Sequence, residues 1–392
     1  MKDVVIVSAQ RTPLGSFGGT LSSLTAPELG AASAIEAIKK AGIKPADIDE
    51  VIFGTVLTAG IGQAPARQVA LKAGLPEKTP STTVNKVCAS GMKSVMYAAN
   101  QIQVGEADIV LAGGMENMSN VPYYLPKHRF GAKMGNAKAI DGMIHDGLWD
   151  VYNDYHMGNA GELCASECGF SREDQDEFAT ESYRRSQKAI EKGYFEDEIT
   201  PVKITDRKGN VEKIDTDEEP SRVKFDKIPN LRPVFSKDGT ITAANASTIN
   251  DGAAALIVMS KEKADELGLE PLAYLRSQSS AAKAPEWFTT APADAMPLAI
   301  SKSGFAKEDI DLFEINEAFS VVTLANNEIL ELDPDNVNIH GGAVSMGHPI
   351  GCSGARILVT LLYALKRTGG TIGCAGICNG GGGASAVVIE MA

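Results

Sequence analysis

Two cysteines in different glycine-rich settings, one near each end of the chain, are the side chains best suited to covalent chemistry. Cys88 lies just before a helical pattern that begins at Ser90, and Cys378 is followed, after one asparagine, by four glycines. His348 stands between a glycine and a proline. Two thiols and an imidazole could together supply a nucleophile, a base and an acid.

The position of Cys88 favours a reactive sulfur. Unpaired amides give a helix N-terminus partial positive charge, which stabilises a thiolate over a thiol. We therefore expect the pKa of Cys88 to be lowered. A buried structural cysteine is the alternative, and the two readings have similar weight on this context alone.

The glycine run after Cys378 predicts exposed backbone amides that could face an anion or an oxyanion. A flexible turn is the more common meaning of such a run. His348 precedes a proline, which disfavours helix and could fix the direction of a basic ring. A solvated loop histidine is the plainer alternative.

Two further features have both a structural and a chemical reading. Asn316 follows an apolar run and could hold a water molecule, although capping of the next helix is the more usual role. Four cations in an otherwise acidic region form either a solvated face or a phosphate site: Arg222, Lys224, Lys227 and Arg232.

The composition narrows the function classes. The chain has 392 residues, a net charge of −13 and six cysteines. The acidic balance argues against nucleic acid as a partner, and the sparse cysteines argue against a disulfide scaffold. The longest apolar run, 357–365, is too short to span a bilayer, so we expect no membrane association. We expect a cytoplasmic location, or the mitochondrial matrix if a leader was removed.

The chain repeats part of itself. Residues 46–49 recur at 308–311, Ser90-Gly91 recurs as Ser353-Gly354, and 109–113 recur at 372–376, at offsets of 262 or 263 positions. Short apolar runs alternate with helical periodicity in both copies. This pattern predicts an α/β fold with a duplicated mixed sheet layered with helices.

Residues 119–248 interrupt this rhythm and predict an inserted loop domain. The expected division is an N-terminal α/β half over 1–118, the insert over 119–248, and a C-terminal α/β half over 249–392. Strands are expected at 4–7, 51–56, 83–84, 109–112, 254–259, 272–277, 312–315, 337–339, 372–375 and 384–389. Helices are expected at 28–41, 90–105, 172–193, 293–303, 317–331 and 354–367.

The ordered set of Cys88, Asn316, His348 and Cys378, within the segments NEAF, GHP and CNGGG, resembles the thiolase family over essentially the whole chain. The likeness is closest to its acetoacetyl-CoA branch, of the potassium-activated, mitochondrial type. It rests on residues 87–93, 113–119, 156–158 and 243–247, and on Arg222-Val223 with Phe225.

The resemblance implies an acyltransferase that reversibly condenses two acetyl-CoA into acetoacetyl-CoA and CoA through an acetyl-cysteine. Cys88 is then the nucleophile, His348 its base, and Cys378 the residue that takes the α-proton. His348 and a water held by Asn316 would form one oxyanion hole. The amides of Cys88 and Gly380 would form the other.

The family pattern also implies ligand contacts. Arg222 and Lys227 would lie near the CoA phosphates, with Ser247, His156 and Tyr183 along the rest of the ligand. It implies no prosthetic group, CoA as substrate and product, and a homotetramer built as a dimer of dimers. A potassium ion would lie near Tyr183, Ala243, Ala244, Ala246 and Val344.

Other classes remain open on the residues alone. A thiol-redox protein would also pair an activated cysteine with a second thiol. A CoA-binding module would use the basic patch without catalysis. A degradative thiolase or a condensing enzyme of fatty-acid synthesis is the nearest alternative within acyl transfer, although the latter pairs its cysteine with two histidines.

Overall fold

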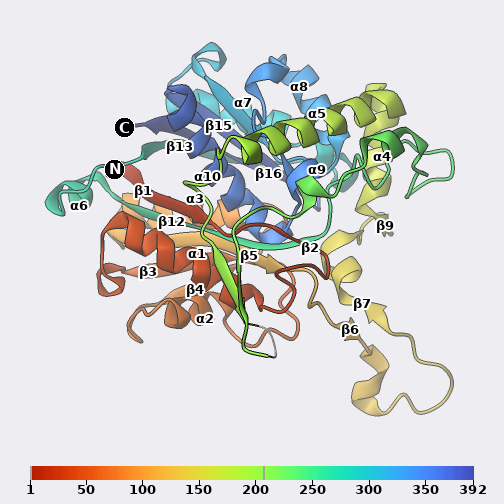
Figure 1. Ribbon diagram of the computed structural model, residues 1–392, viewed down its shortest axis with the longest axis horizontal. Coiled ribbons are helices and arrows are strands. Elements are labelled where there is room, and N and C mark those ends of the chain that lie inside the picture. Colours follow the sequence, from red (N-terminus) through yellow and green to blue (C-terminus); the bar gives the residue numbers. More distant parts are fainter. Residues whose placement is uncertain (1, 206–207) are drawn as a thin grey trace.

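Strands from both copies of the repeat join in one mixed sheet (Figure 1). The computed structural model describes residues 2–205 and 208–392. The sheet strands are β1 Val4–Arg11, β2 Gly15–Ser16, β3 Glu50–Gly54, β4 Ser81–Val84, β5 Ile109–Asn117, β12 Asn250–Ser260, β13 Ala273–Ala282, β14 Leu312–Ile315, β15 Ile372–Asn379 and β16 Gly383–Met391. Within the described ranges their order is β14-β15-β16-β13-β1-β12-β5-β3-β4, with β2 beside β12.

The strand order confirms the duplication. The run β3-β5-β12-β1 repeats as β14-β15-β16-β13, with the same parallel and antiparallel pairings in each half. The two runs meet where β1 pairs with β13 through Val5–Tyr274 and Ile6–Ala273. The sequence placed 254–259 in the second copy, but β12 lies among strands of the first, so that placement is wrong. The α/β class with a layered mixed sheet is confirmed.

One repeated aspartate shows why the two copies fold alike. In the first copy, Asp49 Oδ2 accepts hydrogen bonds from the amides of residues 108 and 109, both at 2.9 Å. In the second copy, Asp311 Oδ2 accepts from the amides of residues 371 and 372 at 2.7 and 2.9 Å. Each carboxylate therefore fixes the start of the parallel strand beside its own.

Helices cover both faces of the sheet. Helices α3 (Ser90–Val104) and α10 (Ile350–Thr368) pack together between the two halves and share one core with both. Helices α1 (Ala26–Ala41) and α2 (Pro65–Lys72) cover the outer face of the first half. Helix α7 (Pro292–Ser303) packs on β13 and β16, followed in sequence by α8 (Ser320–Leu330). The short helices α6 (Lys261–Glu266) and α9 (Ala343–Met346) complete these halves.

The repeated glycines explain how closely α3 and α10 approach. A Cβ atom on Gly91 would lie 2.8 Å from the backbone nitrogen of Ala355, and one on Gly354 would lie 2.6 Å from that of Met92. Each glycine therefore leaves room for the backbone of the other helix. The two helix starts, next to Cys88 and His348 in sequence, are brought together by this contact.

The segment between β5 and β12 holds the elements of the insert. It contains α4 (Met157–Cys168), α5 (Arg172–Glu191), and the strand pairs β6 (Tyr123–Tyr124) with β7 (Ile140–Asp141), β8 (Trp149–Asp150) with β9 (Tyr155–His156), and β10 (Val202–Thr205) with β11 (Val211–Ile214). The β6–β7 arm extends away from the body (Figure 1). Arg11 of β1 anchors the insert, because its guanidinium pairs with Glu198 at 2.5 Å and Asp217 at 2.7 Å.

One expected strand needs correction, and helices α2 and α4 were not predicted. The expected strand at 337–339 follows a 3-10 turn over Pro334–Asn336 and joins β14 only through a bridge at Val337. The sequence pattern missed α2, which has only eight residues, and α4, which is rich in small residues. None of the helices in residues 2–205 and 208–392 combines the length and apolar character needed to cross a bilayer.

Candidate active site

A cavity of about 260 Å³ brings Cys88, His348 and Gly380 to one surface. Its residues come from the start of α3, the β14–α8 loop, the turn before α10 and the β15–β16 turn. The remaining wall is mostly apolar and includes Met157, Phe288, Phe319 and Ile350. A short acyl group could be enclosed here beside a thiol and an imidazole.

A strained turn presents Cys88. Val87 has a φ of 48°, which is rare for a β-branched residue. Its amide donates to Asn85 Oδ1 at 3.0 Å, and its carbonyl accepts from the Ser90 hydroxyl at 2.6 Å. These bonds hold a conformation that costs of the order of 1–3 kcal/mol. The half-buried Cys88 is thereby placed at the cavity, ahead of α3.

Hydrogen bonds fix the ring of His348. Its Nδ1 lies 2.6 Å from the Ser353 hydroxyl, and that hydroxyl donates to the Pro349 carbonyl at 3.0 Å. Because a hydroxyl carries one proton and this one is directed at the carbonyl, we assign Nδ1 as the donor in the ring–serine bond. Nε2 therefore carries the lone pair, and it lies 3.5 Å from Asn316 Nδ2. This arrangement suits His348 to accept a proton at Nε2.

Burial of the site opposes the thiolate that the helix start predicts. Burial raises the pKa of Cys88 to about 12, although the amides of Gly380 and of Cys88 itself partly offset this effect. Burial, assisted by the charge of Arg356, lowers the pKa of His348 to about 3. Desolvation outweighs the field at the helix start because removal of the sulfur from water disfavours its charged form.

Cys378 is fully buried at the end of β15. Burial raises its pKa well above the ordinary value, and the nearby sulfur of Cys88 raises it further. The two sulfurs are therefore close enough to influence each other's charge. The structure brings together the two thiols that lie near opposite ends of the sequence.

The glycines that follow Asn379 are needed for two different reasons. Gly381 and Gly382 have φ angles of 84° and 82°, and a Cβ on Gly382 would lie 2.2 Å from the Lys283 carbonyl. A Cβ on Gly380 would be 3.5 Å from Val87 Cγ1, an ordinary contact. The turn thus requires Gly381 and Gly382, while Gly380 contributes backbone to the cavity wall.

Asn316 does not cap the following helix, contrary to the preferred sequence interpretation. Helix α8 begins at Ser320 without a side-chain cap, whereas the Asn316 amide group faces His348. Its backbone amide donates to the Gly376 carbonyl at 3.0 Å, which joins the β14 and β15 ends. The alternative role, beside the imidazole, therefore fits its position.

The predicted CoA residues divide into two groups. His156 and Ser247 line the cavity. The His156 ring stacks on Phe235 with centroids 4.7 Å apart, and the Ser247 hydroxyl donates to the Ala318 carbonyl at 2.8 Å.

Arg222, Lys227 and Tyr183 are not among the cavity-lining residues. Arg222 pairs with Glu218 at 3.2 Å, and its side chain is 55% exposed. Lys227 lies in the 3-10 turn Phe225–Asn230, whose Phe225 ring meets the buried Tyr183 ring edge-on at 6.4 Å. Both cations are thus available on the surface of the insert.

The potassium candidates lie on two connected parts of the structure. Tyr183 and Val344 share a small apolar cluster. Ala243, Ala244 and Ala246 belong to a turn in which Asn245 Nδ2 donates to Asp176 Oδ1 at 2.8 Å. Asp176 is on α5, the helix that carries Tyr183. Any oxygen ligands from the alanines and the valine would be backbone carbonyls, which suit a hard cation.

Sequence reasoning missed two supporting residues. Ser353, noted only as part of the repeat, contacts His348. Glu116, at the end of β5, accepts from the amides of Val56 and Gly351, both at 2.9 Å, and its burial raises its pKa to about 7. It therefore ties the β3 end to the start of α10. The sequence did offer one indication of this role, because Glu116 is the only acid in β5, a strand otherwise made mostly of small and apolar residues.

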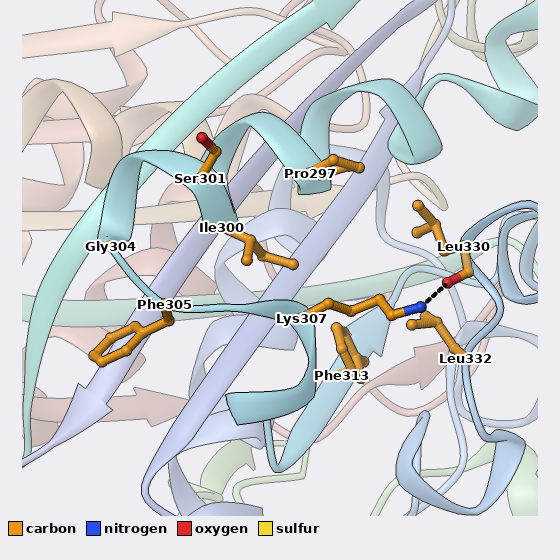
Figure 2. Close-up of a pocket in the computed structure, with 9 residues that line it drawn as sticks. All are labelled: Pro297, Ile300, Ser301, Gly304, Phe305, Lys307, Phe313, Leu330 and Leu332. Carbon is orange, nitrogen blue, oxygen red and sulfur yellow. Dashed lines mark hydrogen bonds between the residues drawn. The ribbon is translucent and has the colours of Figure 1, made fainter.

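A second hollow lies away from this chemistry (Figure 2). It measures about 370 Å³ and lies by α7 and β14. Its walls are largely apolar, and Lys307 Nζ donates to the Leu330 carbonyl at 3.0 Å. No thiol or imidazole lines it, so it does not compete as the reaction site.

Comparisons with known proteins agree with this geometry. Residues 4–262 match the thiolase N-terminal domain and residues 269–391 match the thiolase C-terminal domain. An acetyl-CoA acetyltransferase of Schizosaccharomyces pombe is 54% identical over 99% of this chain and 98% of its own length.

Two other relatives extend the likeness. Acetyl-CoA acetyltransferase 1 of Arabidopsis thaliana is 54% identical over 100% of this chain and 94% of its own length. The crystal structure of the Acat5 thiolase from Ascaris suum, in complex with coenzyme A, matches all of both chains with a TM-score of 0.94 and 46% identity. With a duplicated sheet, two converging thiols and matches along its whole length, the chain belongs to the thiolase family.

Proposed function

We propose that this chain reversibly condenses two acetyl-CoA into acetoacetyl-CoA and CoA through an acetyl group carried on Cys88. One observation carries the proposal: a single cavity presents Cys88, the Gly380 backbone and His348, with the Cys378 sulfur close to that of Cys88. The names of the acetyl-CoA acetyltransferase relatives support the same substrate.

The first half-reaction transfers an acetyl group to the enzyme. The Cys88 sulfur attacks the thioester carbonyl while His348 Nε2 takes the thiol proton. Because the resting pair is neutral, proton transfer accompanies the attack. The amides of Cys88 and Gly380, which act on the Cys88 sulfur, suit the oxyanion that forms beside it. The departing CoA sulfur takes the proton of Cys378, which leaves a thiolate there and an imidazolium at His348.

The second half-reaction forms the carbon–carbon bond. The Cys378 thiolate removes an α-proton from a second acetyl-CoA. His348 and a water held by Asn316 stabilise the enolate oxygen. The enolate carbon attacks the acetyl group and expels the Cys88 sulfur, which recovers its proton from His348. Both thiols and the neutral imidazole are then restored, so the proton balance closes.

Isotope transfer tests this division of labour. After incubation with radiolabelled acetyl-CoA and denaturation, wild type should retain label and Cys88→Ser should not. Cys378→Ala should acquire label more slowly but still retain it, because the CoA thiolate can also leave without the proton that Cys378 supplies. Cys378→Ala should nevertheless form no acetoacetyl-CoA. The buried Cys374, which lies in a different core cluster, offers a matched control, and Cys374→Ala should behave as wild type. Absence of label on wild type, or equal loss of both half-reactions in Cys378→Ala, would contradict the mechanism.

We infer that the insert, residues 119–248, binds the CoA moiety. His156 and Ser247 lie at the cavity end, and Arg222 and Lys227 supply surface charge for phosphates. Lys227→Ala should therefore raise KM for acetyl-CoA and leave kcat unchanged. Lys203→Ala, on β10 of the same insert, is the matched control and should change neither constant.

Further proposals rest on the family likeness. Potassium would bind near Tyr183 and Val344, with the carbonyls of Ala243, Ala244 and Ala246. Enzyme activity would then be higher in potassium than in sodium at equal ionic strength.

The chain would assemble as a homotetramer, which light scattering during chromatography would test. Its location would be the cytoplasm, or the mitochondrial matrix after removal of a leader, which fractionation would distinguish. The first half, expected over 1–118, would also include β12 (Asn250–Ser260), so the second half, expected over 249–392, would begin only after that strand.

A further inference from the structure

Helix α4 carries a second pair of thiols outside the reaction steps described above. The sulfurs of Cys164 and Cys168 lie 3.9 Å apart on successive turns of the helix. Both cysteines are free, and no group of three or more potential metal-ligating side chains occurs in the described parts of the chain. The pair is therefore better suited to thiol chemistry than to a zinc site.

The two sulfurs differ in access. Cys164 is fully buried. Cys168 is partly exposed and lines a groove of about 1070 Å³ beside α5 and α8. A small disulfide could reach Cys168 first from this groove. Cys164 would then be the second thiol, already within contact distance.

The end of the helix can accommodate a bond between them. Residues four apart on a helix have Cα atoms about 6 Å apart, within the disulfide range of roughly 4.4–6.8 Å, but their Cβ atoms must approach by about 1–2 Å. Cys168 is the last residue of α4, and Gly169 follows with a φ of 76°. Only this final turn needs to loosen. The resulting strain makes the disulfide easy to reduce.

Cys164 connects this pair to the reaction cavity. It packs in one cluster with Cys378, Met157, Phe288 and Phe319. Met157, Phe288 and Phe319 also line the cavity. A sulfur drawn from this cluster toward Cys168 leaves the cavity wall with weaker packing.

We propose that Cys164 and Cys168 form a reversible dithiol–disulfide pair, oxidised by low-molecular-weight disulfides, whose closure loosens the wall of the reaction cavity. The Cys168 thiolate attacks the small disulfide and releases one thiol. Cys164 then attacks the Cys168 sulfur, forms the internal bond and releases the second thiol. The protein loses two hydrogens overall, and the small disulfide is reduced to two thiols.

Mass spectrometry tests the bond directly, with oxidised glutathione as the probe. The Cys88→Ser protein is used so that the reaction centre cannot form its own disulfide. After treatment, free thiols are blocked with N-ethylmaleimide and the protein is cut with trypsin. One peptide, residues 139–172, holds both cysteines and has no internal lysine or arginine. It should carry no maleimide and be lighter by two hydrogens, and dithiothreitol should reverse this change.

Two results would overturn the bond: maleimide on both cysteines, or glutathione held on Cys168 without closure. Adding Cys168→Ser to the same background should prevent closure, while adding Cys374→Ala should leave it intact. These masses do not depend on the proposed condensation, so failure of one proposal is distinguishable from failure of the other.

Activity measurements test the effect on the cavity, and this part rests on the proposed function. With Cys88 present, oxidised glutathione should reversibly lower condensation severalfold more in wild type than in Cys168→Ser. Cys374→Ala should respond as wild type. Equal loss in wild type and Cys168→Ser would show that closure does not reach the reaction cavity and would overturn the coupling.

Discussion

The Ser353 hydroxyl lies 2.6 Å from His348 Nδ1 and donates its own hydrogen bond to the Pro349 carbonyl. This relationship sets the tautomer of the base, because it leaves the lone pair on Nε2. Ser353 therefore acts as a positioning residue one helical turn beyond the imidazole.

Loss of that hydroxyl should slow the reaction. Ser353→Ala should lower kcat by about 10- to 100-fold, part of the roughly 100- to 10,000-fold that a positioned base contributes, with little change in KM. The buried Ser94, whose hydroxyl lies within hydrogen-bond distance of the Gly91 and Gly113 carbonyls, is a matched control. Ser94→Ala should cost stability and leave kcat nearly intact. Equal kcat losses in both variants would assign Ser353 a purely structural role.

The pH dependence of Cys88 alkylation should show whether Cys88 and His348 are both neutral before substrate binds. With the pKa of Cys88 raised to about 12, only a small thiolate fraction exists near neutral pH, and it grows tenfold with each unit of pH. The rate of inactivation by iodoacetamide should therefore rise steadily between about pH 6 and about pH 10. A plateau beginning near about pH 7 would instead indicate a preformed thiolate–imidazolium pair.

His340 should make the fold sensitive to mild acid. Burial against Tyr194 and Phe195, together with the charges of Arg367 and Lys188, lowers its pKa from 6.5 to about 4. Below the unfolded value the unfolded chain takes up a proton that the folded chain does not, so stability falls as pH falls from 6.5 toward 4.

His340→Asn should remove this component. At about pH 5 it amounts to about 2 kcal/mol, because one pKa unit corresponds to about 1.4 kcal/mol. Urea unfolding of both proteins at about pH 7 and about pH 5 measures it. The variant should lose less stability than wild type over this interval. Parallel losses would mean that His340 titrates alike in the folded and unfolded states.

A methyl group at the crossing of α3 and α10 should destabilise the protein. In Gly354→Ala the new Cβ would lie 2.6 Å from the Met92 backbone nitrogen, which cannot move without its helix. We expect a loss of about 1–3 kcal/mol or more in unfolding free energy. Gly161→Ala is the matched control, because its Cβ comes too close to only the flexible tip of the Ile241 side chain, at 2.6 Å, and lies at an ordinary 3.5 Å from the Phe319 ring. Similar losses in both variants would contradict a backbone conflict at the crossing.

The sequence predicted much of the scaffold because hydrophobic periodicity and internal repetition can both be recognised from the order of the residues alone. Strand β14 and the length of α3 were found nearly as they occur, whereas β12 was assigned to the wrong copy. Its alternation looks the same whichever sheet half it joins, and only pairing with β1 and β5 decides the matter.

The site was predictable in type but not in charge state. Motifs identified Cys88, His348 and Cys378, yet the field of a helix start suggested a thiolate that burial opposes. The depth of burial depends on how the β15–β16 turn, the insert and α10 close over the sulfur. Ser353 carried no chemical signal of its own, because its role exists only once α10 faces the histidine turn.

The two equivalent helix starts at the centre of the fold have diverged: one is preceded by a nucleophile, the other by a base. Duplication gives a chain two copies of the same structural position, and a change in one leaves the other free to keep its chemistry. Neither half by itself contains a complete reaction centre. Two separately expressed fragments could form a complete centre only by restoring the contact between α3 and α10.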